Sequence, residues 1–256
     1  EGTVAIGFDF SGFTALKTLN LAHSRGLIAE LFNAIPLQAK ASIENLYLTS
    51  VNITGFDFSG FTSLKTLSLD NSRGLIAELF NAIPEGGKAS IEHLYLTSVS
   101  VRGFDFSGFT SLKTLDLDSS RGLTAAQFNA IPAEVKASIE TLDLTSVNVT
   151  GFDFSGFTAL KALNLNNAQG LTAEQFNGIS SEAKDSIESL GLSGVNVTGF
   201  DFSGFRTLKT LDLNNVRGLT TEQFNGISSE AKDSIESLKL SGVNVTGFDF
   251  SEFTNL

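Results

Sequence analysis

The chain has 256 residues, of which 41% are hydrophobic and 18% charged, and its formal net charge is −11. The apolar fraction excludes a disordered chain, and the longest apolar runs are too short to cross a bilayer, so no membrane insertion is expected. The acidic charge argues against nucleic acid as a partner, because phosphate binding needs a basic surface. Because the chain has no Cys, it has no thiol nucleophile, no thiolate metal site and no disulfide. Its two His argue against His-based catalysis and a His-rich metal site.

The composition is skewed because one segment recurs at a fixed spacing. The string GFDFSGF returns with a 48-residue period, and its first five letters open a sixth copy; the copies start at Gly7, Gly55, Gly103, Gly151, Gly199 and Gly247. Each period contains the pattern L-x-x-L-x-L twice, first at 16–21 and then, with Ile in first place, at 43–48. The spacing from Leu19 to Leu46 is longer than that from Leu46 to Leu67, so a 27-residue unit alternates with a 21-residue unit.

Each pattern predicts one short strand, because the two Leu of L-x-L point to one face of a strand and the middle residue to the other. Ten such strands are expected between Leu19 and Leu240. A single strand cannot bury its Leu face alone, whereas parallel strands stacked at the repeat spacing share one core. The pattern therefore predicts a parallel sheet built from repeats.

The segments that return between strands differ in the two kinds of unit. In the long unit, Thr124 and Gln127 have the spacing of a capping box just before Phe128, which predicts a helix. Pro132 is expected to end that helix, and a second helical turn is expected to follow, as over 182–187. The short unit has alternating apolar residues, then Gly and a Phe cluster, which predicts an extended segment and a tight turn without a helix.

The repeated L-x-x-L-x-L pattern resembles the leucine-rich repeat family, and the resemblance covers nearly the whole chain. It implies an α/β right-handed solenoid, an arc or horseshoe, with a parallel concave β-sheet and helices on the convex side of alternate repeats. The family often has Asn three residues after the last Leu of the strand; here that place holds Ser, Ala or Val, as at Ser24, Ala168 and Val51. One solenoid domain over 1–256 is expected, with about five 48-residue double repeats that start and end in mid-repeat. No polar capping unit is visible, so end-to-end self-association is a further expectation.

Several in-register residues are interpreted as structural. All 23 Phe occur in register, which predicts a stacked aromatic core. Asp57 and its equivalents are expected to accept backbone N–H bonds in a turn, because a single Asp in each period supplies too few ligands for calcium; the equivalents are Asp9, Asp105, Asp153, Asp201 and Asp249. Four Asn-x-Thr segments, such as 52–54, fit the glycosylation pattern, and a repeated turn is the favoured alternative. The Gly residues of GFDFSGF are expected to supply positive φ or close backbone approach.

Residues beside the buried Leu are free to vary, and they carry the candidate binding site. Both Tyr of the chain, Tyr47 and Tyr95, lie there and form a patch with Asn45 and His93. An acidic patch beside it consists of Asp70, Asp116, Asp118 and Asp143. These carboxylates would steer a partner with a basic surface. The alternative is a solvated polar sheet face without a partner.

The sequence contains no nucleophile–base pair, metal-ligand cluster or phosphate cradle, so no enzyme activity, catalytic residue, metal or cofactor is expected. We predict a non-catalytic protein–protein interaction module that binds a protein partner on its concave sheet, and the family resemblance implies the same. The alternative is a structural spacer in a larger surface or secreted protein. The inner face varies in the first three repeats and drifts to Ser, Gly and Asn in the last two, which partly supports both functions.

Overall fold

The computed structural model of the chain describes residue 10 and residues 12–256. Gly7, Asp9 and the neighbouring Phe8 lie outside the described residues. The chain divides into two compact units, which are called unit 1 (Glu1–Asp116 with Ser120–Leu123) and unit 2 (Leu117–Ser119 with Thr124–Leu256). The expectation of a single domain over 1–256 stays a prediction.

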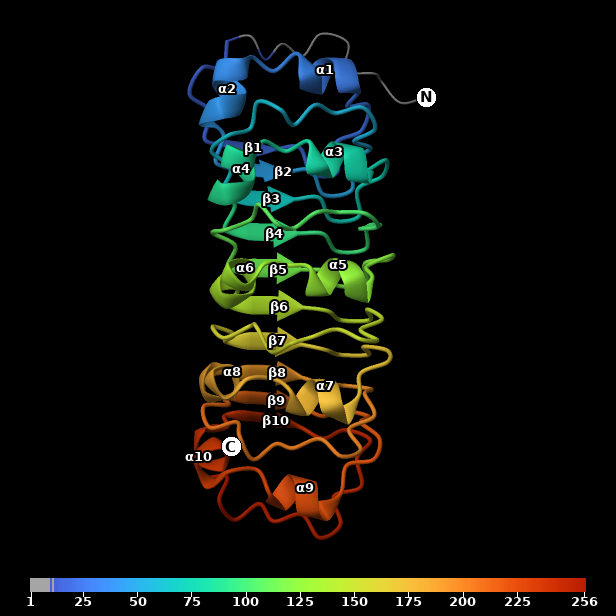
Figure 1. Cartoon of the computed structure of the whole chain (residues 1–256), viewed down its shortest axis with the longest axis vertical. Coiled ribbons are helices and arrows are strands. Elements are labelled where there is room, and N and C mark those ends of the chain that lie inside the picture. Colours follow the sequence, from blue (N-terminus) through green and yellow to red (C-terminus); the bar gives the residue numbers. More distant parts are fainter. Residues whose placement is uncertain (1–9, 11) are drawn as a thin grey trace. The chain divides into compact units, whose positions relative to one another are not determined.

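Unit 1 contains five parallel strands within its described residues: β1 Thr18–Asn20, β2 Asn45–Tyr47, β3 Thr66–Ser68, β4 His93–Tyr95 and β5 Thr114–Asp116. They pair in chain order, with each central Leu opposite the next, as Figure 1 shows. Unit 2 is described throughout and contains β6 Thr141–Asp143, β7 Ala162–Asn164, β8 Ser189–Gly191, β9 Thr210–Asp212 and β10 Ser237–Lys239. These strands also pair in parallel and in chain order.

The ten expected parallel strands are therefore confirmed, with one difference in their bounds. Each strand spans the first Leu of L-x-L and its two neighbours, so it starts and ends one residue before the predicted segment. The second Leu still donates to the neighbouring strand, for example from the Leu48 amide to the Ser68 carbonyl at 2.9 Å. The chain turns immediately afterwards, which ends the strand there.

Every 27-residue return carries two short helices, and the 21-residue returns carry none in the described residues. In unit 1 the helices are α1 Ala29–Asn33, α2 Leu37–Ser42, α3 Ala77–Asn81 and α4 Glu85–Ser90. In unit 2 they are α5 Ala125–Asn129, α6 Ala133–Ser138, α7 Ala173–Asn177, α8 Ser181–Ser186, α9 Thr221–Asn225 and α10 Ser229–Ser234. Within each unit, the odd-numbered helices lie toward the strand arrowheads and the even-numbered ones toward the strand starts (Figure 1). Because these described helices have five or six residues, none of them can cross a membrane.

The predicted capping boxes exist, although not in every repeat. The hydroxyl of Thr172 accepts from the Gln175 amide, and the Gln175 side chain accepts in turn from the Thr172 amide. Thr220 forms the same pair. At the equivalent place in α3, Ile76 offers no side-chain cap. Pro132, which was expected to end α5, is the N-cap residue of α6.

The core of each repeat is a cluster of phenylalanine rings against the strand leucines. Phe128 is fully buried, with its ring centroid 4.2 Å from that of Phe152 and 5.3 Å from that of Phe157. The other repeats contain equivalent stacks, such as Phe80 on Phe104 at 4.2 Å. The stacked aromatic core is thus confirmed for the described rings, although Phe13 and Phe250 are each 41% exposed and Phe248 is only half-buried. Phe8 lies outside the described residues.

The GFDFSGF turn uses its residues as expected. Gly151 has a φ of +75°, and a Cβ at Gly156 would lie 2.9 Å from Cδ of Lys136, so both predicted uses of glycine occur. The Asp153 carboxylate accepts the Ser155 amide at 2.9 Å. Equivalent bonds at Asp57, Asp105, Asp201 and Asp249 confirm the turn interpretation for this row, while Asp9 is outside the described residues.

Candidate binding surface on the sheets

The two tyrosines of unit 1 lie on the strands on either side of one serine. Tyr47, Ser68 and Tyr95 are register partners on β2, β3 and β4. Ser68 is only 4% exposed, although it belongs to the row of side chains that points away from the core, while both tyrosines are half-buried. Neither phenolic hydroxyl bonds to another described residue. The pair therefore offers two rings and two unused hydroxyl groups to a ligand.

Carboxylates beside the tyrosines are held by neighbouring strands. Asp70 accepts from the Ser68 hydroxyl at 2.9 Å and from the Thr97 amide at 2.8 Å. Asp116 accepts from the Thr97 hydroxyl at 3.3 Å. Burial raises the pKa of Tyr95, and the negative charges of Asp116 and Asp70 raise it further. The Tyr95 hydroxyl therefore stays protonated at neutral pH and remains a hydrogen-bond donor.

Asn45 and His93 lie in the neighbouring row of the same face. The Asn45 side-chain amide donates to the Thr18 hydroxyl at 3.4 Å, and Nδ1 of His93 lies 3.0 Å from the Thr114 hydroxyl. Both side chains are half-buried and bridge to a neighbouring strand. Unit 1 thus contains six of the eight predicted site residues: Asn45, Tyr47, Asp70, His93, Tyr95 and Asp116.

The remaining two predicted residues belong to unit 2. Asp118 accepts from the Ser119 hydroxyl at 2.8 Å. Asp143 accepts from the Thr145 amide at 2.8 Å and from the Asn164 side chain at 2.9 Å. The four predicted carboxylates are consequently divided between the two units, and the single acidic patch stays a prediction.

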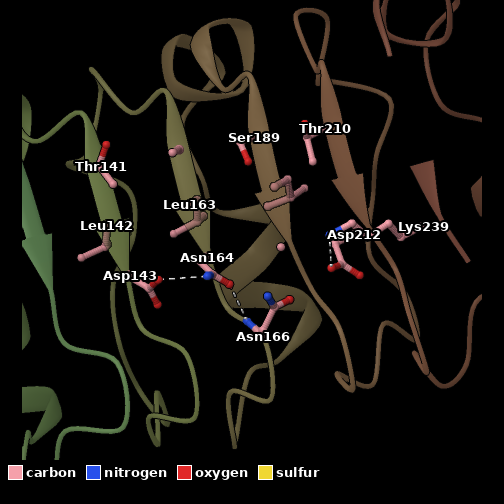
Figure 2. Close-up of a pocket in the computed structure, with 13 residues that line it drawn as sticks. Thr141, Leu142, Asp143, Leu163, Asn164, Asn166, Ser189, Thr210, Asp212 and Lys239 are labelled. Carbon is pink, nitrogen blue, oxygen red and sulfur yellow. Dashed lines mark hydrogen bonds and ion pairs between the residues drawn. The ribbon is translucent and has the colours of Figure 1, made fainter. Parts of the chain in front are cut away.

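The sheet face of unit 2 has a hollow of about 300 Å³ that the sequence analysis missed. Gly191 is one of its lining residues, and a Cβ there would lie only 2.7 Å from the Asn164 side-chain oxygen and 3.0 Å from that of Asn166. Figure 2 shows these two amides between Asp143 on one side and Asp212 on the other. The signal in the sequence was a glycine between two leucines on a strand, at a position where it weakens the strand unless something approaches closely.

Five buried lysines were also missed, although one recurs in every period; they are Lys40, Lys88, Lys136, Lys184 and Lys232, each at most 8% exposed. The Lys136 ammonium lies 5.7 Å from the Phe157 ring centroid and 6.0 Å from that of Phe128. Lys184 donates to the Asn177 carbonyl at 3.0 Å. The lysine stem therefore packs on the aromatic cluster while its ammonium satisfies backbone carbonyls, which is a structural role.

A second missed row is the asparagine that ends each odd-numbered helix. The Asn129 side chain donates to the Gly151 carbonyl at 3.0 Å and accepts from the Asp153 amide at 2.8 Å. The same pair of bonds occurs at Asn33, Asn81, Asn177 and Asn225. The structure thus contains an asparagine ladder at the ends of the odd-numbered helices. It does not lie three residues after the last Leu of the strand, where the leucine-rich repeat family often has Asn.

No group of three or more His, Cys, Asp or Glu side chains in the described part of the chain is placed to hold a metal ion. The hollow in unit 2 combines carboxylates, amides and hydroxyls without a nucleophile–base pair among its lining residues. These surfaces have the chemistry of recognition, namely hydrogen-bond donors, acceptors and aromatic rings held in fixed positions.

Comparison with known proteins relates the chain to solved structures only. No protein-family model matches the sequence, and comparison with the curated proteins found no match. A leucine-rich-repeat protein of Leptospira interrogans superposes with a TM-score of 0.59 at 19% identity, over 97% of this chain and 58% of that one. The functional domain of InlJ from Listeria monocytogenes superposes with a TM-score of 0.58 at 14% identity, over 97% and 58%.

A third solved structure is TLR13 in its complex with ssRNA13, with a TM-score of 0.51 at 19% identity over 89% of this chain and 31% of that one. The chain therefore spans little more than half the length of the first two proteins and a third of the last. The comparisons establish that this chain has the leucine-rich-repeat fold, as the sequence pattern predicted.

Proposed function

We propose that the chain is a non-catalytic interaction module that binds a protein partner on the sheet face of unit 1. The observation that carries the proposal is the tyrosine pair, because Tyr47 and Tyr95 are the only tyrosines of the chain and both lie on this face. Large, rigid aromatic side chains with a free polar group are favoured anchors of protein interfaces. Their half-burial reduces the entropy that is lost when a partner immobilises them.

The carboxylates favour a partner with a basic surface. Asp70 and Asp116 flank Tyr95, and Asp118 and Asp143 add negative charge in unit 2. Complementary charge would mainly raise the association rate, because exposed charges steer the encounter more than they stabilise the complex. The acidic charge also argues against a nucleic acid on this face, although TLR13 shows that the fold itself is compatible with one.

A structural spacer remains the second candidate, and the face of unit 2 favours it. There the Asn166 side chain accepts from the Ser193 amide at 2.7 Å, and Asn214 accepts from the Ser241 amide at 2.7 Å. Side chains that bridge successive strands in this way stabilise the stack and leave fewer groups for a ligand. Asp70 makes the equivalent bond with the Thr97 amide in unit 1, so these bonds alone do not separate the two functions. Unit 2 favours the spacer because its strands also carry no aromatic residue, whereas a binding module needs an exposed patch like that of unit 1.

The test starts with a photo-crosslinking residue in place of Asn20, the exposed register partner of Tyr47. The matched control carries it in place of Thr158, which is exposed in the turn of a short unit. A protein captured only at position 20 is then purified, and its affinity is measured for the wild type and for the double variant Tyr47→Ala/Tyr95→Ala. The proposal predicts at least a ten-fold weaker complex and slower association in added salt. Unchanged affinity of the double variant would favour the spacer.

A further inference from the structure

The two edges of the sheet in unit 1 carry charge in different ways. At the edge where the strands begin, Lys and Glu alternate from one strand to the next, through Lys17, Glu44, Lys65, Glu92 and Lys113. Neighbours pair, with Lys17 2.6 Å from Glu44 and Lys113 2.7 Å from Glu92. The cations of this edge are therefore neutralised by carboxylates of the same row.

The opposite edge, where the strands end, carries arginines without such partners. Arg25, Arg73 and Arg121 occupy equivalent positions in three successive periods, and all three are exposed. Their guanidinium groups form no ion pair and no hydrogen bond with any described residue. A fourth cation, Arg102, joins this edge, because its Cβ lies within 3.0 Å of the position that a Cβ of Gly122 would occupy. This set of four side chains is called the arginine edge.

A polar groove of about 680 Å³ lies between the first two arginines. Its lining includes Arg25 and Arg73 together with the hydroxyls of Ser50 and Ser98 and the amide of Asn52. No Asp, Glu or aromatic residue contributes to this lining. In a chain of net charge −11, a groove with two unpaired cations and no carboxylate is electrostatically suited to an anion.

The side chains of the groove and the distance between its arginines indicate which kind of anion fits there. Guanidinium groups bind the planar or tetrahedral oxygens of carboxylate, sulfate and phosphate through two parallel bonds. Successive arginines are two strands apart, which is about 10 Å at ordinary strand spacing. Serine hydroxyls and an asparagine amide between them offer donors and acceptors to neutral hydroxyl groups. The groove lacks the aromatic rings on which single-stranded nucleic acids stack their bases.

We propose that the arginine edge of unit 1 binds a linear anionic polysaccharide that carries sulfate or phosphate esters. The anionic groups contact the arginines, and the sugar hydroxyls contact the Ser and Asn side chains of the groove. This site is separate from the sheet face with Tyr47 and Tyr95, so a protein partner and a polysaccharide have different contact residues. The inference therefore does not depend on the proposed protein-binding function.

The experiment uses the full chain with heparin oligosaccharides as the sulfated probe and a phosphorylated glycan as the second probe. The double variant Arg25→Gln/Arg73→Gln removes both guanidinium groups of the groove. Arg217→Gln is the matched control, because Arg217 is an exposed arginine in the equivalent position of unit 2, where the preceding repeat has Gln169 instead of arginine. Circular dichroism checks that all variants fold, and calorimetry at several salt concentrations measures affinity.

The proposal predicts that the wild type binds at least one of the two probes and that fully desulfated heparin, which keeps its carboxylates, binds at least ten-fold more weakly than the bound probe. The double variant should lose at least ten-fold in affinity and show a weaker salt dependence, while Arg217→Gln changes affinity less than two-fold. A preference for the sulfated or the phosphorylated probe identifies the ester. The proposal is overturned if neither probe binds, if both variants lose affinity equally, or if single-stranded RNA binds more tightly and displaces the oligosaccharides.

Discussion

The sheet faces of the two units have the same leucine register but expose different chemistry. Unit 1 exposes Tyr47, His93 and Tyr95, whereas the strands of unit 2 carry no aromatic residue, and Gly191 opens a hollow there. The charges differ too, since unit 1 has nine Lys and Arg against eleven Asp and Glu, and unit 2 has eight against seventeen. The core restricts the Leu and Phe positions in both units, so divergence between repeats collects on the faces and edges. We therefore expect functional differences between the two units in the side chains of their faces and edges.

The largest expected loss of stability comes from the phenylalanine core, because both units contain the same ring stacks. Phe128→Ala in unit 2 removes a fully buried ring and should lower the free energy of unfolding by about 3–5 kcal/mol. Phe80→Ala should cost the same in unit 1, because its ring makes the same stack. Urea denaturation and hydrogen exchange measure the loss, which can take the form of local fraying in a repeat protein. Thr158→Ala, at an exposed position, is the control, and a near-neutral Phe128→Ala would contradict the stacked core.

The asparagine ladder should give the next largest effect. Asn129→Ala removes one donated and one accepted hydrogen bond to the turn after it, for a loss of about 1–2 kcal/mol. Asn129→Asp keeps the acceptor for the Asp153 amide but places a carboxylate oxygen against the Gly151 carbonyl, so at neutral pH it should cost at least as much as Asn129→Ala. Equal stability of the wild type and Asn129→Ala in urea would show that water replaces both bonds without loss.

The strand and helix pattern was predictable from the sequence because its causes are local. Leucine spacing determines which strand face is buried, and Thr172 with Gln175 forms the capping box that its spacing indicates. The Asn129 ladder was not predictable in the same way, because its partners lie more than twenty residues away and only the fold places them within hydrogen-bond distance. The hollow over Gly191 likewise depends on Asn side chains from neighbouring strands.

Helix capping distinguishes the early repeats from the late ones and allows a gain of stability. Ile76 is the N-cap residue of α3, where it provides no side-chain hydrogen bond, and it is 52% exposed, so Ile76→Thr should stabilise the chain by about 0.5–1 kcal/mol. The reverse change, Thr172→Ile in α7, should destabilise it by a similar amount. Thermal denaturation measures the change in stability of each variant. A destabilised Ile76→Thr would mean that the exposed Ile contributes packing that outweighs the cap.

Acid should weaken the GFDFSGF turns in both units. A hydrogen bond from the Ser155 backbone lowers the pKa of Asp153, and the same serine's side chain lowers it further. A carboxyl group with a lowered pKa adds stability above its unfolded pKa of about 4, and this contribution disappears as the pH falls through the lower folded value. The stability difference between the wild type and Asp153→Asn should therefore be smaller at pH 3 than at pH 7. A difference that is independent of pH would show that the charge of Asp153 contributes nothing.

The buried rings of the core stabilise the fold, whereas the tyrosines of unit 1 lie on the proposed binding face. The most direct test is the free energy of unfolding, by urea denaturation, of Tyr47→Ala/Tyr95→Ala beside that of Phe128→Ala. Both tyrosines are half-buried and belong to the row of side chains that points away from the core. The double variant should therefore lose less than about 1 kcal/mol of unfolding free energy, which is well below the loss expected for Phe128→Ala. A loss of about 3 kcal/mol or more would show that the tyrosine pair is part of the folding core, and the account of a separate binding face would be wrong.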